Sequence, residues 1–138
     1  MEAARACGFG NEPDYNGRSG EGAWIAELAV RDGRRHSAWQ ACLQPALRRA
    51  NLQVETGALV HAVELADGRA TGVRYRQGGA LRRAGARQVV LAAGAYGSPQ
   101  LLMLSGVGPG AQLREFGIPV QVDAPEVGAN LQDHLQIR

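Results

Sequence analysis

The feature that most constrains the fold is a continuous apolar run, Val89–Ala93, which ends in Gly94. A run without polar alternation is typical of a strand buried on both faces of a parallel sheet. Ser98 and Pro99 follow, and these residue types favour the N-cap and the first position of a helix in the segment 98–104. A buried strand, a glycine turn and a helix N-terminus together present backbone N–H groups to a phosphate. The segment therefore predicts an α/β element and a candidate phosphate cradle, although many turns of this kind bind nothing.

Upstream of this segment the pattern predicts a broken helix and a small antiparallel sheet. Residues 37–50 begin with Ser37 as a candidate N-cap, and Pro45 is expected to divide the helix into two short pieces. Strand-like runs then alternate with the turn signals Asp67-Gly68 and Gly78-Gly79. These runs, at 52–56, 58–65, 70–76 and 80–84, predict a meander with one face in solvent. Downstream, a short helix at 111–116 is expected to end at Gly117, before a brief strand at 120–122.

Composition narrows the class of protein. The chain has 138 residues, enough for one modest domain, and a net charge of +2, too weak to recruit nucleic acid. No stretch approaches the roughly 20 apolar residues of a membrane span, and the first residues lack a signal peptide, so a cytoplasmic location is expected. Cys7 and Cys42 are expected to be reduced thiols. No three His, Cys or carboxylate residues have the spacing of metal ligands.

The residues from Val89 to Pro109 closely resemble a signature of the glucose–methanol–choline (GMC) oxidoreductase family, and other blocks match in the same order. These blocks are at 14–17, 21–22, 33–37, 51–52, 69–73 and 127–134. The resemblance covers essentially the whole chain and is to an internal fragment of a choline dehydrogenase-like member. It implies a partial FAD-binding, Rossmann-like α/β domain (with α+β elements) that carries a small antiparallel β-meander. The first dinucleotide-binding turn, G-x-G-x-x-G, is absent.

The resemblance implies an FAD-dependent enzyme that oxidises the CH–OH group of an alcohol, choline-like or another primary alcohol, by hydride transfer to the flavin. Oxygen or a quinone-like carrier would be the electron acceptor. Residues 1–36 would belong to the substrate side, 37–123 to the FAD-binding domain, and 124–138 to a loop returning to the substrate domain. Two alternatives remain: a catalytically inactive truncated remnant, at most a weak nucleotide-binding module, or a lyase on the same flavoprotein fold.

The resemblance also assigns cofactor contacts. It places the backbone of Val60 against the adenine, although from the residues alone Val60 is more simply a core position. Ala92, Ala93 and Gly94 would form a small-residue turn against the diphosphate or ribose, where bulky side chains would block close approach. Ser98 either contacts the cofactor or only caps its helix.

Near the flavin the resemblance places Asn130, Gln132 and His134. Asp133 beside His134 has the composition of a base and its orienting group, but the family's proton-accepting His lies in a C-terminal segment that this chain does not contain. No catalytic residue is therefore expected here, and the isolated chain is expected to be inactive. Glu126 stands where the family usually has Gly. Two further histidines, His36 and His61, are expected to face solvent or to cap local structure.

Overall fold

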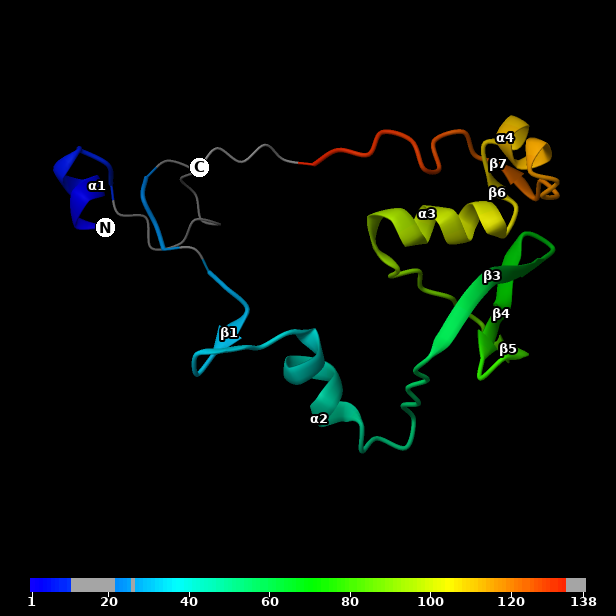
Figure 1. The fold of residues 1–138 in the computed structure, drawn as a ribbon, viewed down its shortest axis with the longest axis horizontal. Helices are drawn as coiled ribbons and strands as arrows, with labels where there is room; N and C mark the ends of the chain where they lie inside the picture. Colours follow the sequence, from blue (N-terminus) through cyan, green and yellow to red (C-terminus); the bar gives the residue numbers. More distant parts are fainter. Residues whose placement is uncertain (11–21, 26, 134–138) are drawn as a thin grey trace. The chain divides into compact units, whose positions relative to one another are not determined.

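The computed structural model describes residues 1–10, 22–25 and 27–133, which fall into two compact units, Met1–Val54 and Glu55–Arg138. Figure 1 shows the order of the helices and strands along the chain. The whole is a mixture of helices and small sheets, as the sequence predicted.

The first unit contains short elements. A one-turn helix, α1 (Glu2–Ala6), precedes a two-stranded hairpin of β1 (Val30–Arg31) and β2 (Arg34–Arg35). Two helical pieces follow, the π-helical η1 (Trp39–Leu43) and α2 (Gln44–Ala46). The predicted division near Pro45 is confirmed, because the π-helical turn ends and the α-helical turn begins beside that proline.

The start of η1 is fixed by Gln40 rather than by the hydroxyl of Ser37 alone. The Gln40 side-chain carbonyl accepts a hydrogen bond from the Ser37 backbone N–H at 3.0 Å and another from the Ser37 hydroxyl. A glutamine reaching back to an amide at the helix start is one half of a capping box. The N-cap position itself falls at Ala38, one residue after the position predicted.

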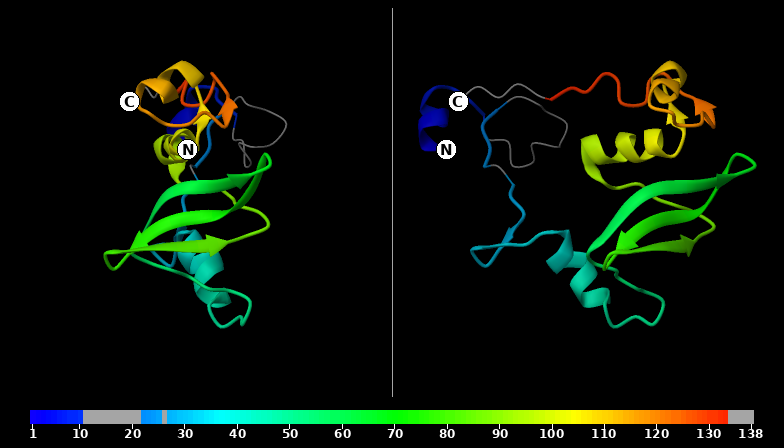
Figure 2. Two further views of the ribbon diagram at one scale, coloured as in Figure 1. Left: turned by 90° about the vertical axis from the view of Figure 1, so that its right-hand side faces the viewer. Right: turned by 45° about the vertical axis from the view of Figure 1, so that its right-hand side comes forward.

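The second unit is built on the predicted meander, which is confirmed. Strands β3 (Ala58–Ala66), β4 (Arg69–Gln77) and β5 (Ala80–Gly85) pair antiparallel in sequence order, and Figure 2 shows the twisted sheet from two sides. Positive φ angles of 50° at Asp67 and 73° at Gly68 make the tight first turn. The prediction of a strand at 52–56 is wrong, because these residues form no regular secondary structure. Side-chain bonds from Gln77 to Glu55 (2.9 Å) and to the Thr56 carbonyl (3.0 Å) hold part of that run, and none of the described strands pairs with it.

The rest of the second unit is α3 (Gly94–Leu104), β6 (Val107–Gly108), α4 (Gly110–Glu115) and β7 (Val122–Asp123). β6 and β7 form a short parallel pair. The helix predicted at 111–116 is confirmed within one residue at each end, and Gly117 follows it with a φ of 68°. The brief strand expected at 120–122 lies slightly later along the chain.

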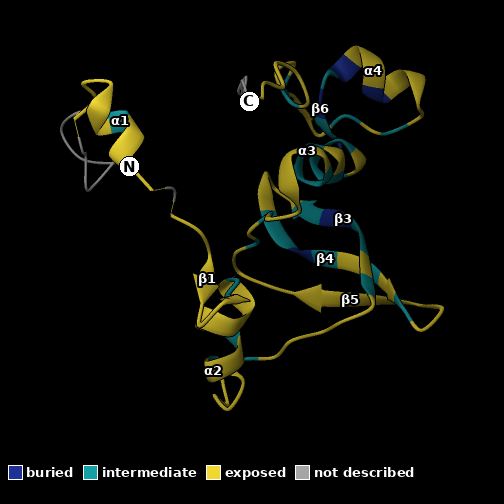
Figure 3. Ribbon diagram, turned by 60° about the vertical axis from the view of Figure 1, so that its left-hand side comes forward, coloured by how far each residue is buried: buried dark blue, intermediate teal, exposed yellow. Residues whose placement is uncertain are grey.

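The described core is small. Its buried apolar side chains are Ala62, Val63 and Leu113. Figure 3 shows that most residues of both units are exposed to solvent. α3 packs along β3. No helix in the described part of the chain is long and apolar enough to cross a membrane.

The apolar run at 89–93 is not a strand in the structure, so that prediction is wrong here. Val89 and Leu91 are half-buried and line a small hollow with side chains of β3 and α3, whereas Val90 between them is 79% exposed. The run is thus extended with one covered face. A strand needs hydrogen-bonded neighbours, and none of the described strands pairs with these residues.

α3 also begins earlier than predicted. Ser98 is not its N-cap and Pro99 is not its first residue, because the helix starts at Gly94 and contains Pro99. Gly94 has a φ of 84°, which turns the chain directly into the helix after the apolar run. The proline lies in the second turn, where it removes one backbone hydrogen bond without ending the helix.

Candidate cofactor site

The N-terminus of α3 is an open turn of small residues. Ala92, Ala93 and Gly94 are all exposed, and a Cβ built on Gly94 would meet no atom within 4 Å. The first amides of a helix have no partner within it, and the aligned peptide dipoles make this end favourable for an anion. A phosphate group therefore has both room and hydrogen-bond donors at this turn.

Ser98 fixes the shape of this turn from inside the helix. The backbone N–H of Ala93 donates to the Ser98 hydroxyl oxygen at 3.0 Å. The bond fixes the amide just before the helix, so that amide is not free for a ligand. Ser98 is half-buried, and its direct contact with a cofactor stays a prediction. Its structural role is to shape the turn.

Val60 lies on β3, opposite Tyr75 of β4, and is half-buried. The pairing register shifts directly after it, between Val60 and Ala62, so that His61 forms a bulge. β3 is an edge strand of the meander. An edge strand leaves part of its backbone free to pair with a planar partner, which is the property that the adenine contact requires.

β3 and α3 are joined by a hydrogen bond of 2.8 Å from the Val63 N–H to the Ser105 hydroxyl. The two elements also pack against each other, and Figure 1 shows α3 beside β3. Val60 lies near the start of β3 and Gly94 at the start of α3, each on its own element. The structure does not bring the two residues into contact with each other.

A loop with two left-handed residues passes along α3. Gly128 has a φ of 82° and lies against Met103, whose Cε is 3.4 Å from where a Gly128 Cβ would stand. Asn130 has a φ of 56°, and its side-chain amide donates to a carboxylate oxygen of Glu126 at 3.0 Å. Glu126 thus holds Asn130, a contact that a glycine at 126 would lack. From Gly128 the chain runs toward the N-terminal end of α3 (Figures 1 and 2).

Several predicted residues lie outside the described part of the chain. These are His134 and the blocks 14–17 and 21. Asn130 and Gln132 are exposed, and their placement near a flavin stays a prediction. The pairing of Asp133 with His134 is likewise not described.

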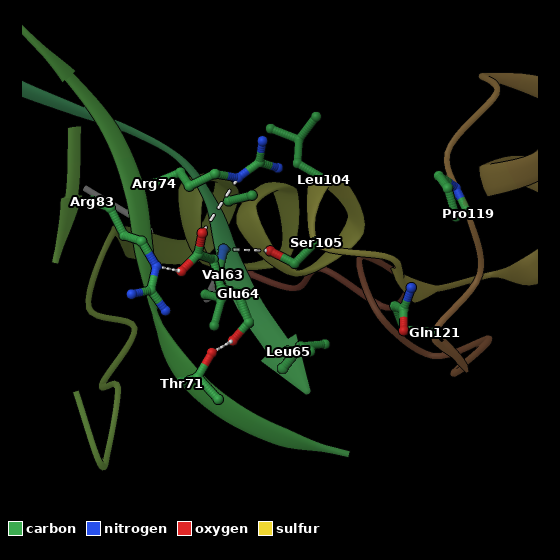
Figure 4. A pocket seen from close by; sticks show the side chains of 11 residues that line it. Val63, Glu64, Leu65, Thr71, Arg74, Arg83, Leu104, Ser105, Pro119 and Gln121 are labelled. Carbon is green, nitrogen blue, oxygen red and sulfur yellow. Dashed lines mark hydrogen bonds and ion pairs between the residues drawn. The ribbon is translucent and has the colours of Figure 1, made fainter. Parts of the chain in front are cut away.

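Sequence reasoning missed the polar groups beside the junction. A hollow of about 450 Å³ is lined by Glu64, Arg74, Arg83, Ser105 and seven neighbours, and Figure 4 shows these side chains. Glu64 accepts a hydrogen bond from Nε of Arg83 and lies 4.0 Å from Nε of Arg74. Charge alone gave no signal, because the partners come from three different strands. Only the strand register, once known, aligns them.

The histidines and cysteines add no further site. Nε2 of His61 is buried and has no hydrogen-bond partner in the described structure, so the expectation that His61 faces solvent or caps local structure is wrong for this atom. Cys7 and Cys42 are free and exposed. Within residues 1–10, 22–25 and 27–133, no three His, Cys, Asp or Glu side chains gather as a metal site would require.

Comparison with known proteins extends these observations. Residues 1–136 match the sequence model described as GMC oxidoreductase. The chain is 46% identical over 137 residues to an oxygen-dependent choline dehydrogenase of Rhizobium etli, covering 99% of this chain and 25% of that protein. A second oxygen-dependent choline dehydrogenase, from Brucella anthropi, is 46% identical over 138 residues with the same coverage. The chain therefore spans about a quarter of the length of these relatives.

Two solved structures of oxidoreductases are similar to this chain. The chain superimposes on pyridoxine 4-oxidase from Mesorbium loti with a TM-score of 0.76 and 31% identity, over 91% of this chain and 25% of the other. It also superimposes on an FAD-dependent oxidoreductase from Chaetomium thermophilum with a TM-score of 0.62 and 34% identity, over 66% of this chain and 16% of the other.

Proposed function

Because this chain belongs to the GMC oxidoreductase family, we propose that it forms part of the FAD-binding region of an enzyme that oxidises an alcohol. Bound FAD supplies the acceptor for the hydride that leaves the CH–OH carbon. The relatives are choline dehydrogenases by name, which favours choline or a similar primary alcohol. Oxygen, named for those relatives, or a quinone-like carrier would take the electrons.

The observation that carries the proposal is the open small-residue turn at the start of α3. Ala92, Ala93 and Gly94 are exposed, and Gly94 leaves open space on its Cβ side. We assign this turn to the diphosphate or ribose of FAD, with Ser98 shaping it through the Ala93 amide. The half-buried Val60 on the edge strand would offer its backbone to the adenine.

Residues of the loop that carries Gly128 and Asn130 would lie beside the flavin. Asn130 and Gln132 are exposed on a loop whose backbone is held by Gly128 and by the bond from Asn130 to Glu126. We assign His134, which follows directly, to the same region. The chain alone is expected neither to hold FAD stably nor to oxidise alcohols, because it spans about a quarter of the relatives' length.

A chimera tests the proposal. This chain would replace the matching quarter of the Rhizobium etli choline dehydrogenase, and the purified protein would be examined for a flavin spectrum and for bleaching by choline. We expect a yellow chimera and a colourless isolated chain. Gly94→Val should lower the FAD content, because a β-branched side chain at a φ of 84° is strained and fills the open turn.

Gly117→Val is the matched control, since Gly117 also has a positive φ, 68°, and open space but lies after α4, away from the turn. A folded but colourless chimera would refute FAD binding by this region. Equal FAD contents in the two variants would refute the assignment of the turn, while the parent chimera still reports on the function itself.

A further inference from the structure

Two pairs of arginines face each other directly across antiparallel strands. Arg74 of β4 is opposite Arg83 of β5, and Arg31 of β1 is opposite Arg34 of β2. Like charges directly opposite each other in a sheet destabilise it. A negative charge on the same face of the sheet would offset the repulsion within each pair.

The meander supplies this counter-charge itself. Glu64, on the third strand, accepts a hydrogen bond from Arg83 and lies 4.0 Å from Arg74. Its side chain is only 22% exposed, and Figure 4 shows its carboxylate between the two guanidinium groups. One carboxylate therefore serves both arginines.

Among the described residues, no third strand pairs with the hairpin of β1 and β2. Its nearest carboxylate, Asp32, sits in the turn, 3.9 Å from Nε of Arg31, and its side chain is 93% exposed. An ion pair this exposed contributes little. Among the described residues no carboxylate forms an ion pair with Arg34. The hairpin thus repeats the arginine pair of the meander without the shared carboxylate.

Other hydrogen-bond donors lie on the same side of this pair. The His36 N–H donates to the Ala29 carbonyl at 2.7 Å, which continues the ladder and places the His36 side chain on the face of Arg34. The side-chain carbonyl of Gln40 accepts a hydrogen bond from Ser37, which leaves the side-chain NH₂ group of Gln40 to donate to another partner. Both residues line an open hollow of about 720 Å³, together with Arg31, Arg34, Arg35 and the exposed Asp32 of the turn.

We propose that this face of the hairpin binds a small oxyanion, a carboxylate or a phosphate group, between Arg31 and Arg34. The planar guanidinium fork matches two oxygens of either group. The imidazole of His36 and the amide of Gln40 add donors from the neighbouring segment. The oxyanion takes the place that Glu64 occupies in the meander. None of these residues belongs to the turn assigned to FAD.

The test uses the full chain, labelled with ¹⁵N, and follows the Nε–Hε signals of its arginines by NMR. Inorganic phosphate and acetate are titrated separately at constant ionic strength, with chloride as the balancing anion. We expect saturable shifts at Arg31 and Arg34 with at least one of the two anions. Shifts with neither, or shifts shared equally by Arg48 and Arg49, would overturn the proposal, because they would reflect screening alone.

Arg34→Gln should weaken binding about tenfold, since it removes one charged fork. Arg49→Gln is the control, because it makes the same charge change at an exposed position elsewhere in the first unit. Equal affinities in these two variants would overturn the assignment.

Gln40→Glu tests the idea without removing an arginine. The glutamate keeps the acceptor for Ser37 and adds a carboxylate to the hollow, so it should compete with the anion. We expect phosphate or acetate binding to fall about tenfold and the His36 amide to exchange more slowly with solvent. Unchanged binding together with unchanged exchange would overturn the proposal even if Arg34→Gln unfolds the hairpin.

Discussion

The backbone N–H of Val63 donates a hydrogen bond of 2.8 Å to the hydroxyl of Ser105, 42 residues further along the chain. The same hydroxyl donates to the Leu101 carbonyl one turn back in α3, at 2.5 Å. One serine therefore connects the edge of the meander to the last turn of the helix. Val63 is only 8% exposed. Its backbone amide, which the Ser105 hydroxyl satisfies, therefore has little access to water.

Replacing this serine tests how much the junction contributes to stability. Ser105→Ala leaves the Val63 amide unpaired, and an unsatisfied group of this kind costs roughly 1–3 kcal/mol. We expect the free energy of unfolding, measured with urea, to fall within that range. Ser98→Ala is the control, because the amide that Ser98 holds belongs to an exposed residue and can bind water. Equal losses in the two variants would contradict a special role for Ser105.

Glu64 should matter because of the arginines that it separates. Glu64→Gln leaves Arg74 and Arg83 opposite each other without a counter-charge. The arginine side chains are 54% and 60% exposed, so the loss should be modest, about 0.5–1 kcal/mol, and smaller in high salt. The same substitution in an Arg83→Gln background should cost less. Additive losses in a double-mutant cycle, measured by urea unfolding, would show that Glu64 and Arg83 do not interact.

Met103 should hold the loop that carries Asn130. Its side chain lies against Gly128 and also against Gly108, and its removal leaves the loop without this support. Met103→Ala should therefore speed hydrogen exchange at the Ala129 amide, which bonds the Glu126 carbonyl at 3.1 Å. The amides of β4 should exchange as before. Faster exchange everywhere would indicate general destabilisation instead.

Local chemistry predicted the meander well. Its turns are set by Asp67-Gly68 and Gly78-Gly79, whose positive φ angles few other residue types adopt easily. The change from π-helix to α-helix beside Pro45 and the end of α4 near Gly117 follow from the same kind of local constraint. Each of these features is decided within a few residues of the one that causes it.

Features that need distant partners were not predictable in this way. The run at 89–93 has the composition of a buried strand, but its pairing depends on strands that the described residues do not provide. The bond from Val63 to Ser105 and the grouping of Glu64 with two arginines depend on the register of the sheet. The Ser98 and Pro99 signal was misplaced by a turn because Gly94 starts the helix earlier.

Gly106 should be the least replaceable glycine of the second unit, because its position combines a left-handed backbone with close packing. Its φ is 85°, and a Cβ there would stand 2.4 Å from the Pro119 carbonyl oxygen. Gly117 has a similar φ, 68°, with no atom within 4 Å of its Cβ position. Gly117→Ala should therefore cost only the left-handed strain, roughly 1–2 kcal/mol.

Gly106→Ala should cost that strain and the overlap with Pro119 as well, about 3 kcal/mol or more in all. The Gly106 carbonyl accepts hydrogen bonds from the backbone N–H groups of Gln121 at 2.8 Å and Val122 at 3.1 Å, just before β6 pairs with β7. The overlap would push these two segments apart and so weaken both bonds. Urea unfolding of the two alanine variants would measure the difference directly. Equal costs would mean that the chain between α4 and β7 shifts freely to accept a side chain, and that the packing at Gly106 does not constrain this region.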